Sequence, residues 1–267
     1  MNRILFIIAA LFITGTPTLI AQDQANIKFS VYLMPSKTSN NQELEKIKDI
    51  HFAFGDINIP MNLKEARQSM AFPYKGEGNL TFFRVTTEGD KVVRKVLCST
   101  PIPASKKKAI ILLRQDKGKY TLKAFWFGAN ENVSQARIVN LTNKNLALKI
   151  QGEKKITALK PGANTTASAT YKTPNSDYGY CYVKAYTKKL LSNSEEKYRK
   201  LLSTNLSLTK KDARVALLLN RNKGIRSVTL SSNGIPNKGE LLELQKYLPW
   251  YLKATTASKG QPASQGL

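Results

Sequence analysis

With 267 residues, 42% of them hydrophobic, the chain is long enough to bury one large core or two small ones. Its 42 lysines and arginines against 18 aspartates and glutamates give a net charge of +24, which favours anionic partners but also serves solubility. The charges are spread in short runs, the two cysteines and the one histidine form no cluster, and no glycine-rich phosphate loop occurs. The composition therefore indicates neither specific nucleic-acid recognition nor a metal or cofactor site.

The first residues are typical of a signal peptide. Arg3 precedes the apolar run Ile4–Ile13, Thr14–Pro17 interrupt it, and Ala21 offers a small residue for cleavage. The run is shorter than the ~20 residues that a membrane-spanning helix needs, and no later segment is long enough either. We therefore expect residues 1–21 to be removed and the protein to be exported, to the periplasm or to the extracellular side and cell surface. The alternative is an uncleaved anchor.

Residues 22–130 are expected to form a first β-sandwich half. Apolar and polar residues alternate over Ile27–Leu33, which is typical of a half-buried strand. Gly89 and Asp90 are turn residues between two further strand patterns. The other strands predicted in this half are Phe52–Phe54, Asn58–Asn62, Ser69–Phe72, Leu80–Thr86, Lys91–Cys98, Ala109–Leu113 and Tyr120–Phe125.

Residues 131–235 are expected to form a second half of the same kind. Pro161 and Gly162 mark a turn within it. The strands predicted from its own pattern are Ala136–Leu141, Leu146–Ile150, Lys155–Leu159, Thr165–Tyr171 and Tyr180–Tyr186.

An internal repeat relates the two halves. The segment Val93–Cys98 (VRKVLC) aligns with Tyr198–Ser203 (YRKLLS), which matches Arg94 with Arg199. Upstream, Thr81–Arg84 aligns with Cys181–Lys184; downstream, with one residue of slippage, Leu112-Leu113 aligns with Leu218-Leu219 and Lys117-Gly118 with Lys223-Gly224.

The repeat changes the prediction for one segment. Residues 193–202 contain good helix formers and an N-cap candidate in Ser194, so taken alone they favour a helix. Their counterpart 91–98 is rich in valine, which favours strands. We therefore predict a strand over Lys197–Ser203.

Each half then carries about seven strands in roughly a hundred residues, which is the size of an immunoglobulin-like sandwich. The predicted fold is all-β, with two tandem related immunoglobulin-like β-sandwich halves. The second half opens with Arg137-Ile138-Val139-Asn140-Leu141-Thr142, followed by Leu146-Ala147-Leu148 and Leu159-Lys160-Pro161-Gly162. This pattern of R-V-x-N-x-S/T and then L-x-P-G resembles the opening strands of small secreted bacterial immunoglobulin-like modules of unknown function. The resemblance covers part of the second half and implies a fold, with no activity or site.

The end of the chain has a different pattern. Apolar residues at helical spacing predict a short helix within 236–254, which ends or kinks at Pro249. Residues 255–267 are small and polar, so we expect them to be disordered. The helix is expected to dock on the sandwich; the alternative is that it lies on a membrane or a partner through Trp250 and Tyr251.

The sequence offers little catalytic chemistry. Cys98 and Cys181 lie in predicted strands, one in each half, and two interpretations stay open: a disulfide that joins the halves, or two buried free thiols. Triad chemistry would have to use His51, and a lone histidine at the start of a strand is more often structural. No pair of carboxylates stands out, so we assign no catalytic residue, no metal site and no cofactor.

Tyrosines on one predicted strand provide the one candidate binding surface. Tyr178, Tyr180, Tyr182 and Tyr186 fall at even spacing and share one face, while Val183 and its alternate neighbours share the other. We favour the interpretation that the tyrosine side packs in the core. If it is exposed instead, stacking and charge would let it bind sugar rings or acidic polymer. The candidate binding residues are Tyr178, Tyr180, Tyr182, Lys184, Lys188 and Lys189.

These patterns favour an exported, non-enzymatic binding or structural protein of the bacterial envelope. Its expected partner is an anionic envelope polymer or another envelope protein. One alternative is a glycan-acting envelope enzyme that uses carboxylates we do not identify, and another is an accessory subunit of a secreted assembly.

Overall fold

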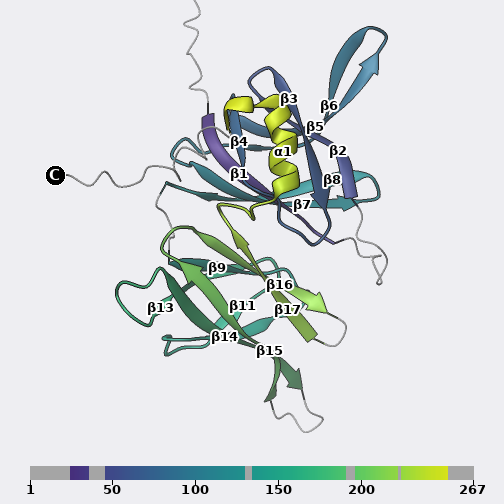
Figure 1. The fold of residues 1–267 in the computed structure, drawn as a ribbon. Coiled ribbons are helices and arrows are strands. Elements are labelled where there is room, and N and C mark those ends of the chain that lie inside the picture. Colours follow the sequence, from purple (N-terminus) through teal and green to yellow (C-terminus); the bar gives the residue numbers. More distant parts are fainter. Residues whose placement is uncertain (1–24, 36–45, 130–133, 191–195, 222–223, 252–267) are drawn as a thin grey trace, which may run out of the picture.

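The computed structural model describes residues 25–35, 46–129, 134–190, 196–221 and 224–251 (Figure 1). It is a mostly β protein, with 66% of the described residues in strands and 7% in helix, arranged as three sheets and a short C-terminal helix. The expected signal peptide, the expected disordered tail and the expected boundary between residues 130 and 131 lie outside the described residues.

The first half of the chain forms one strongly curled sheet. Its strands are β1 (Ala25–Leu33), β2 (Lys46–Phe54), β3 (Ile57–Lys64), β4 (Phe72–Gly76), β5 (Asn79–Glu88), β6 (Lys91–Pro101), β7 (Lys108–Asp116) and β8 (Lys119–Phe127). They are ordered β6-β5-β2-β4-β1-β7-β8, and β3 pairs with β2. Strand β1 runs parallel to β7, whereas β5–β6 and β7–β8 are antiparallel hairpins.

The second half forms two sheets. Its strands are β9 (Gln135–Asn140), β10 (Leu146–Ile150), β11 (Thr157–Leu159), β12 (Asn164–Ser168), β13 (Thr170–Tyr171), β14 (Tyr178–Leu190), β15 (Glu196–Thr209), β16 (Arg214–Arg221) and β17 (Gly224–Ser231). One sheet is ordered β11-β10-β14-β13 with β15 on β14, and the other β12-β9-β16-β17. Strand β9 runs parallel to β16. The strand predicted over Lys197–Ser203 is confirmed within β15, so the helical alternative for that segment is wrong.

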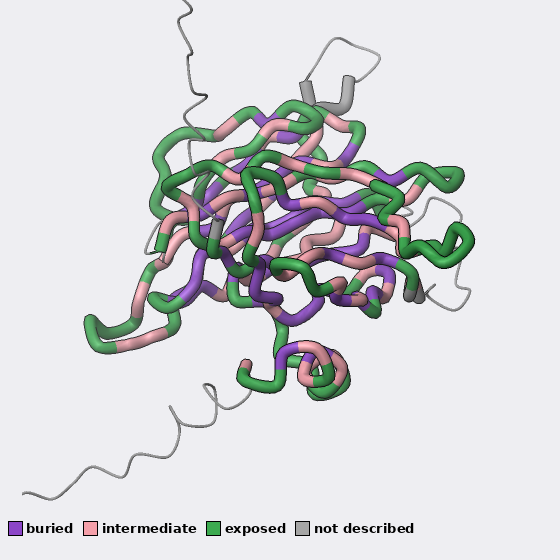
Figure 2. The backbone as a smooth tube through the Cα atoms, turned by 90° about the horizontal axis from the view of Figure 1, so that it is seen from above, coloured by how far each residue is buried: buried purple, intermediate pink, exposed green. Residues whose placement is uncertain are grey.

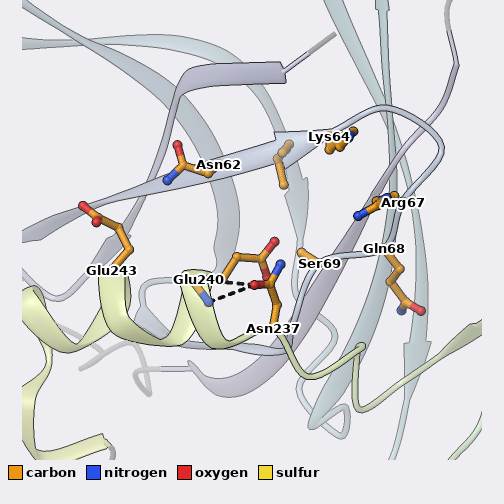
Figure 3. A pocket seen from close by; sticks show the side chains of 10 residues that line it. Asn62, Lys64, Arg67, Gln68, Ser69, Asn237, Glu240 and Glu243 are labelled. Atoms are coloured by element: carbon orange, nitrogen blue, oxygen red, sulfur yellow. Dashed lines mark hydrogen bonds between the residues drawn. The ribbon is translucent and has the colours of Figure 1, made fainter. Parts of the chain in front are cut away.

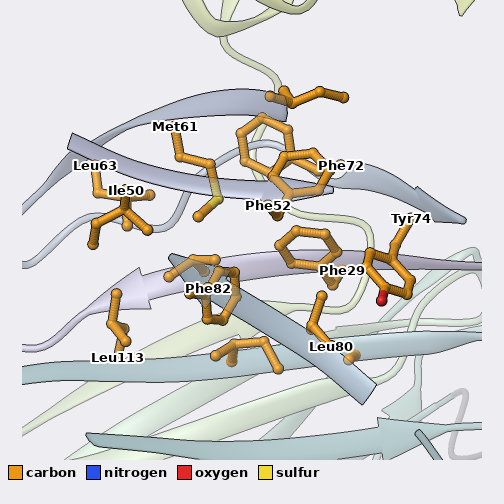
Figure 4. Close-up of a cluster of buried hydrophobic side chains, with 14 of the residues drawn as sticks. Phe29, Ile50, Phe52, Met61, Leu63, Phe72, Tyr74, Leu80, Phe82 and Leu113 are labelled. Atoms are coloured by element: carbon orange, nitrogen blue, oxygen red, sulfur yellow. The ribbon is translucent and has the colours of Figure 1, made fainter. Parts of the chain in front are cut away.

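The core of the first half is aromatic (Figure 4). The Phe29 ring lies edge-on to Phe52 at 5.0 Å between centroids, and Phe72 and Phe82 lie at 5.7 and 5.8 Å. Aromatic pairs in such tilted and edge-to-face arrangements add stability beyond the apolar area that they bury. The core of the second half is built from smaller side chains, among them Ala136, Ala167, Cys181, Ala185 and Ala216.

A third buried cluster joins the halves. Tyr32, Ile110, Leu112, Phe125 and Phe127 from the first half pack with Val139, Ala213, Val215, Leu217, Leu219 and Leu230 from the second. Strands β7 and β16 are therefore buried on both faces, which is why their sequences are continuous apolar runs rather than alternating ones. The same junction corrects the prediction for β1: it was expected to be half-buried, but Ser30 and Tyr32 on its second face are buried too. Figure 2 shows buried segments along the middle strands and exposed residues at the loops.

The segment after β9 forms a hydrogen-bonded corner around Asn140. The buried Asn140 side chain donates to the carbonyls of Lys144 and Leu159 at 2.8 and 2.9 Å, and its Oδ1 accepts from the Thr142 hydroxyl at 2.6 Å. The Gly162 amide donates to the Asn140 carbonyl at 2.7 Å, from a backbone with a φ of 78° that favours glycine. The asparagine and the Pro-Gly turn therefore fix how β9 is connected to β10 and β12.

Helix α1 (Lys238–Tyr247) follows the second half in sequence but packs on the first. Asn237 caps it by accepting from the amides of Gly239 and Glu240 at 3.0 and 3.3 Å. Leu244 and Leu248 are buried in the aromatic core. The predicted short helix is confirmed, as is its docking on the sheet. Among the described residues, no helix has the length and apolar character needed to cross a bilayer.

The two cysteines are free thiols in the structure, which is the second of the two interpretations. Cys98 on β6 packs against the aromatic core, whereas Cys181 on β14 is buried in the core of the second half, and both are free thiols. The residues sit in different cores because β6 and β14 belong to different sheets. Burial raises the pKa of Cys98 to about 11 and also raises the pKa of Cys181.

Candidate functional site

Strand β14 presents three of its tyrosines to solvent, while Tyr186, beyond the register shift at Ala185, is only partly exposed. Tyr178, Tyr180 and Tyr182 are 59%, 46% and 37% exposed, whereas Cys181 and Val183 between them are buried. The interpretation that the tyrosine side packs in the core is therefore wrong, and the alternative, an exposed aromatic face, is what the structure contains. The reason is that the other face of β14, with Cys181, Val183 and Ala185, already packs into a close-fitting core of aliphatic side chains.

Neighbouring strands extend this surface with polar and basic residues. On β15, Ser203, Asn205 and Ser207 pair with Lys184, Tyr182 and Tyr180, and on β10, Lys149 pairs with Lys184. Directly paired residues of antiparallel strands point to the same face. We call this surface the tyrosine face, and it consists of Tyr178, Tyr180, Tyr182, Lys184, Lys149, Ser203, Asn205 and Ser207.

Local contacts hold the middle of the tyrosine face in place. The Tyr182 hydroxyl is hydrogen-bonded to the Ser203 hydroxyl, and the Lys184 ammonium lies 5.3 Å from the Tyr182 ring centroid. The Tyr182 amide donates to Oε1 of Gln151 at 3.1 Å. A ring fixed in this way loses little rotamer freedom when a ligand stacks on it, which lowers the entropic cost of binding.

The charge of the tyrosine face is positive, because it contains two lysines and no carboxylate. At the Tyr178 end, Lys211 forms an ion pair with Asp177. That hydrogen bond and charge lower the pKa of Asp177, so Lys211 is already neutralised. The cations that remain for an anionic ligand are therefore Lys149 and Lys184.

The structure brings four of the six predicted binding residues together. Tyr178, Tyr180, Tyr182 and Lys184 share the face, while Lys188 and Lys189 lie further along β14 with side chains outside the described residues. Sequence reasoning missed Lys149 and the polar residues of β15. Alternation within Leu146–Ile150 could have placed Lys149 outward, but only the strand register places it beside Lys184.

A pocket of about 480 Å³ lies between α1, β3 and the segment 67–69 (Figure 3). Its wall includes two carboxylates, Glu240 and Glu243, which the sequence analysis did not single out. Glu240 accepts a hydrogen bond from the Met70 amide at 2.7 Å, and its burial raises its pKa. Glu243 pairs with Lys246 at 2.7 Å.

These two carboxylates do not have the arrangement of a glycosidase pair. Such enzymes place their carboxyl groups on either side of the scissile bond, whereas Glu240 and Glu243 are neighbours on one face of one helix. Glu240 instead connects α1 to the segment before β4 through its hydrogen bond with the Met70 amide. Glu240 therefore helps to hold the helix on the sheet. The arrangement of the two carboxylates gives no support to glycoside hydrolysis in this pocket.

His51 is likewise placed for packing. Its ring stacks on Phe83 with 6.2 Å between centroids and 15° between planes. Partial burial lowers the pKa of His51 more than nearby Asp49 raises it, so the ring is neutral at pH 7. In the described part of the chain, no group of three or more histidine, cysteine, aspartate or glutamate side chains could hold a metal ion. No protein-family model and no curated protein matches the sequence.

Proposed function

We propose that this chain is an exported, non-enzymatic binding protein of the bacterial envelope that holds an anionic polymer on the tyrosine face. The exposure of Tyr178, Tyr180 and Tyr182 on one strand carries the proposal. Three aromatic rings in a row on a solvated sheet leave apolar area uncovered, and clustered exposure of this kind marks binding surfaces. Sugar rings of an acidic polysaccharide would stack on the tyrosines while their carboxylates or sulfates meet Lys149 and Lys184.

The proposal includes the two immunoglobulin-like halves. Three observations support it: each half begins with a strand parallel to a later one, each of those later strands opens a hairpin, and the corner at Asn140 accounts for the pattern that carries the resemblance. The function lies on the second half, and the first half supplies a rigid base through the shared buried cluster.

The experiment compares retention of the protein on immobilised polygalacturonate and on neutral dextran. Replacing Tyr178, Tyr180 and Tyr182 together with alanine should weaken binding to the acidic polymer by about tenfold or more, since each stacked ring contributes on the order of 1 kcal/mol. Leu242 and Ile57 are exposed apolar residues elsewhere, and their alanine variants are the control. Because charge contacts are screened and stacking is not, part of the wild-type binding should persist at high salt.

Equal retention of the triple variant and the wild type would contradict the tyrosine face as the site. Binding that disappears entirely in salt, with no effect of the tyrosines, would leave only the net charge of +24 as the source of attraction.

A further inference from the structure

No strand in the described structure is hydrogen-bonded to the outer edge of strand β6, although the curl of the sheet brings part of β6 close to β8. Strand β6 is the terminal strand of the eight-stranded sheet and pairs only with β5. Figure 1 shows the loop end of the β5–β6 hairpin projecting beyond the rest of the first half. Val92 and Val96 on this edge are 64% and 62% exposed. An exposed edge with apolar residues is a template for another strand.

The turn at the tip fixes which backbone groups point outward. Gly89 has a φ of 62° and opens a two-residue turn, after which Glu88 pairs with Lys91. In such hairpins the pair that flanks the turn is hydrogen-bonded, and the pairs then alternate. The amides and carbonyls of Val92, Arg94 and Val96 therefore point away from β5, toward solvent.

The charges along this edge select the partner. Lys95 pairs directly with Arg84 across the hairpin, and neither is part of an ion pair among the described residues. The Arg84 guanidinium lies 5.9 Å from the Tyr120 ring centroid, so it is Lys95 that is left for a carboxylate. Like charges placed opposite each other on a sheet destabilise it. A carboxylate on an added strand would lie beside Lys95 and relieve that repulsion. A second copy of β6 would instead bring further Arg94 and Lys95 side chains to the same place.

The two faces of the edge differ. Val92, Arg94 and Val96 point to one face, and Lys91, Val93 and Lys95 to the other. The Arg94 guanidinium is already held on the first face, by the Asn58 side chain at 2.7 Å and over the Phe83 ring at 5.1 Å. The first face thus offers apolar contacts and the second offers lysines, which fits a strand whose residues alternate between apolar and acidic.

We propose that β6 is a docking edge for an extended segment of another protein in which apolar and acidic residues alternate, added as an extra strand over Lys91–Val96. The backbone amides of Val92, Arg94 and Val96 donate to the segment, Val92 and Val96 contact its apolar residues, and Lys91 and Lys95 contact its carboxylates. The edge is separate from the tyrosine face, so a polymer and a protein bind at once. Lysines on an edge also deter aggregation, but two exposed valines do not serve that purpose.

The test measures binding of two fluorescent eight-residue peptides to the full chain by anisotropy. In one peptide glutamate and valine alternate; in the other four glutamates precede four valines, so charge and composition are equal. Val92→Pro removes one outward amide and leaves the β5 pairing intact. Its control is Thr87→Pro, at the facing position of β5, which removes an exposed amide that does not belong to the β6 edge. Lys95→Glu removes the selecting charge, and Lys155→Glu makes the same change in net charge on an exposed loop of the second half.

The alternating peptide should bind more tightly than the block peptide. Val92→Pro and Lys95→Glu should each weaken it by about three- to tenfold, which corresponds to one lost hydrogen bond or charge contact, while both controls stay within about twofold. Equal binding of the two peptides, or no effect of Val92→Pro in a protein with an unchanged unfolding midpoint, overturns the proposal. Self-association of the chain that Val92→Pro abolishes would also overturn it, because the occupant of the edge would then be a second copy. Loss of peptide binding when the three tyrosines are removed would overturn it as well.

Discussion

In the first half, large rings such as Phe29, Phe52 and Phe82 fill the space inside a single curled sheet, whereas in the second half leucines, isoleucines, alanines and a cysteine lie between two separate sheets. Large side chains keep the walls of a core apart, and small ones let two sheets approach closely. The aromatic core therefore needs a further element to cover it, and helix α1 covers it with Leu244 and Leu248. Among the described residues, no helix covers the second core.

The halves nevertheless meet through matching strands. Ile110 and Leu112 on β7 face the junction, as Val215 and Leu217 do on β16. The residues between them, Ile111 on β7 and Ala216 on β16, face the core of their own half. At the junction, equivalent faces of β7 and β16 therefore pack against each other. This supports the proposed repeat, and it couples the stabilities of the two halves.

The largest effect should come from the ring at the centre of the aromatic core. Phe29→Ala removes the side chain that lies against four other rings, and it should lower the free energy of unfolding by about 3–5 kcal/mol. The comparison is Ile138→Ala in the core of smaller side chains, where about 2–4 kcal/mol is expected. Urea unfolding of both variants checks this, and equal losses below 1 kcal/mol would show that neither core is packed as described.

Loss of a contact made by helix α1 should destabilise the first half, although α1 follows the second half in the sequence. Leu244→Ala on α1 should cost about 2–3 kcal/mol, because this leucine is buried in the core of the first half. Leu242→Ala is the matched control on the same helix, where the side chain is 52% exposed and an effect below about 0.5 kcal/mol is expected. A single unfolding transition in both variants is the expected result for coupled halves, and two separate transitions would count against the coupling.

A polar corner in the second half should show a smaller effect. Asn140→Ala leaves the carbonyls of Lys144 and Leu159 without their donor inside a buried site, so unfolding should become easier by about 2 kcal/mol. Gln68→Ala makes the comparison at the junction, where Gln68 donates to the Ser30 hydroxyl at 2.7 Å and to the Ser231 carbonyl at 2.6 Å. If Asn140→Ala is neutral by thermal unfolding, the corner does not stabilise β9 and its neighbours.

Much of the strand content could be predicted, because alternation and turn residues act locally. The repeat was sufficient to predict a strand in 197–203. Further along the chain, however, the alignment paired residues that face different sides of their strands. Slippage matched Leu112, which faces the junction, with Leu218, which faces the second core. Asp116 pairs with Lys119 and Arg221 pairs with Gly224, so the offset that matches Arg94 with Arg199 also matches these two pairs without slippage.

Which face of a strand is buried could not be predicted in the same way. The upstream alignment matched the buried Phe82 with the exposed Tyr182, and a shift of one residue exchanges the two faces of a strand. The tyrosine face was assigned to the core because large aromatic residues are usually buried. Which face of β14 is buried depends on the sheet that contains β9 and β16. The sequence of β14 alone does not show on which side that sheet packs.

The smallest expected effect concerns the cysteines, one in each core. At pH 8 a thiol with a pKa of about 11 is ionised to about one part in a thousand, so iodoacetamide should leave Cys98 in the native protein almost unmodified. Both Cys98 and Cys181 should react in urea without prior reduction, which mass spectrometry detects. Because the unfolded thiol ionises near pH 9 and the folded one does not, Cys98 should make the protein less stable as the pH rises from 9 toward 11, and Cys98→Ala should reduce that slope. Alkylation that requires a reductant would instead mean that the cysteines are paired, and the two cores would then have to lie closer together than their separate sheets allow.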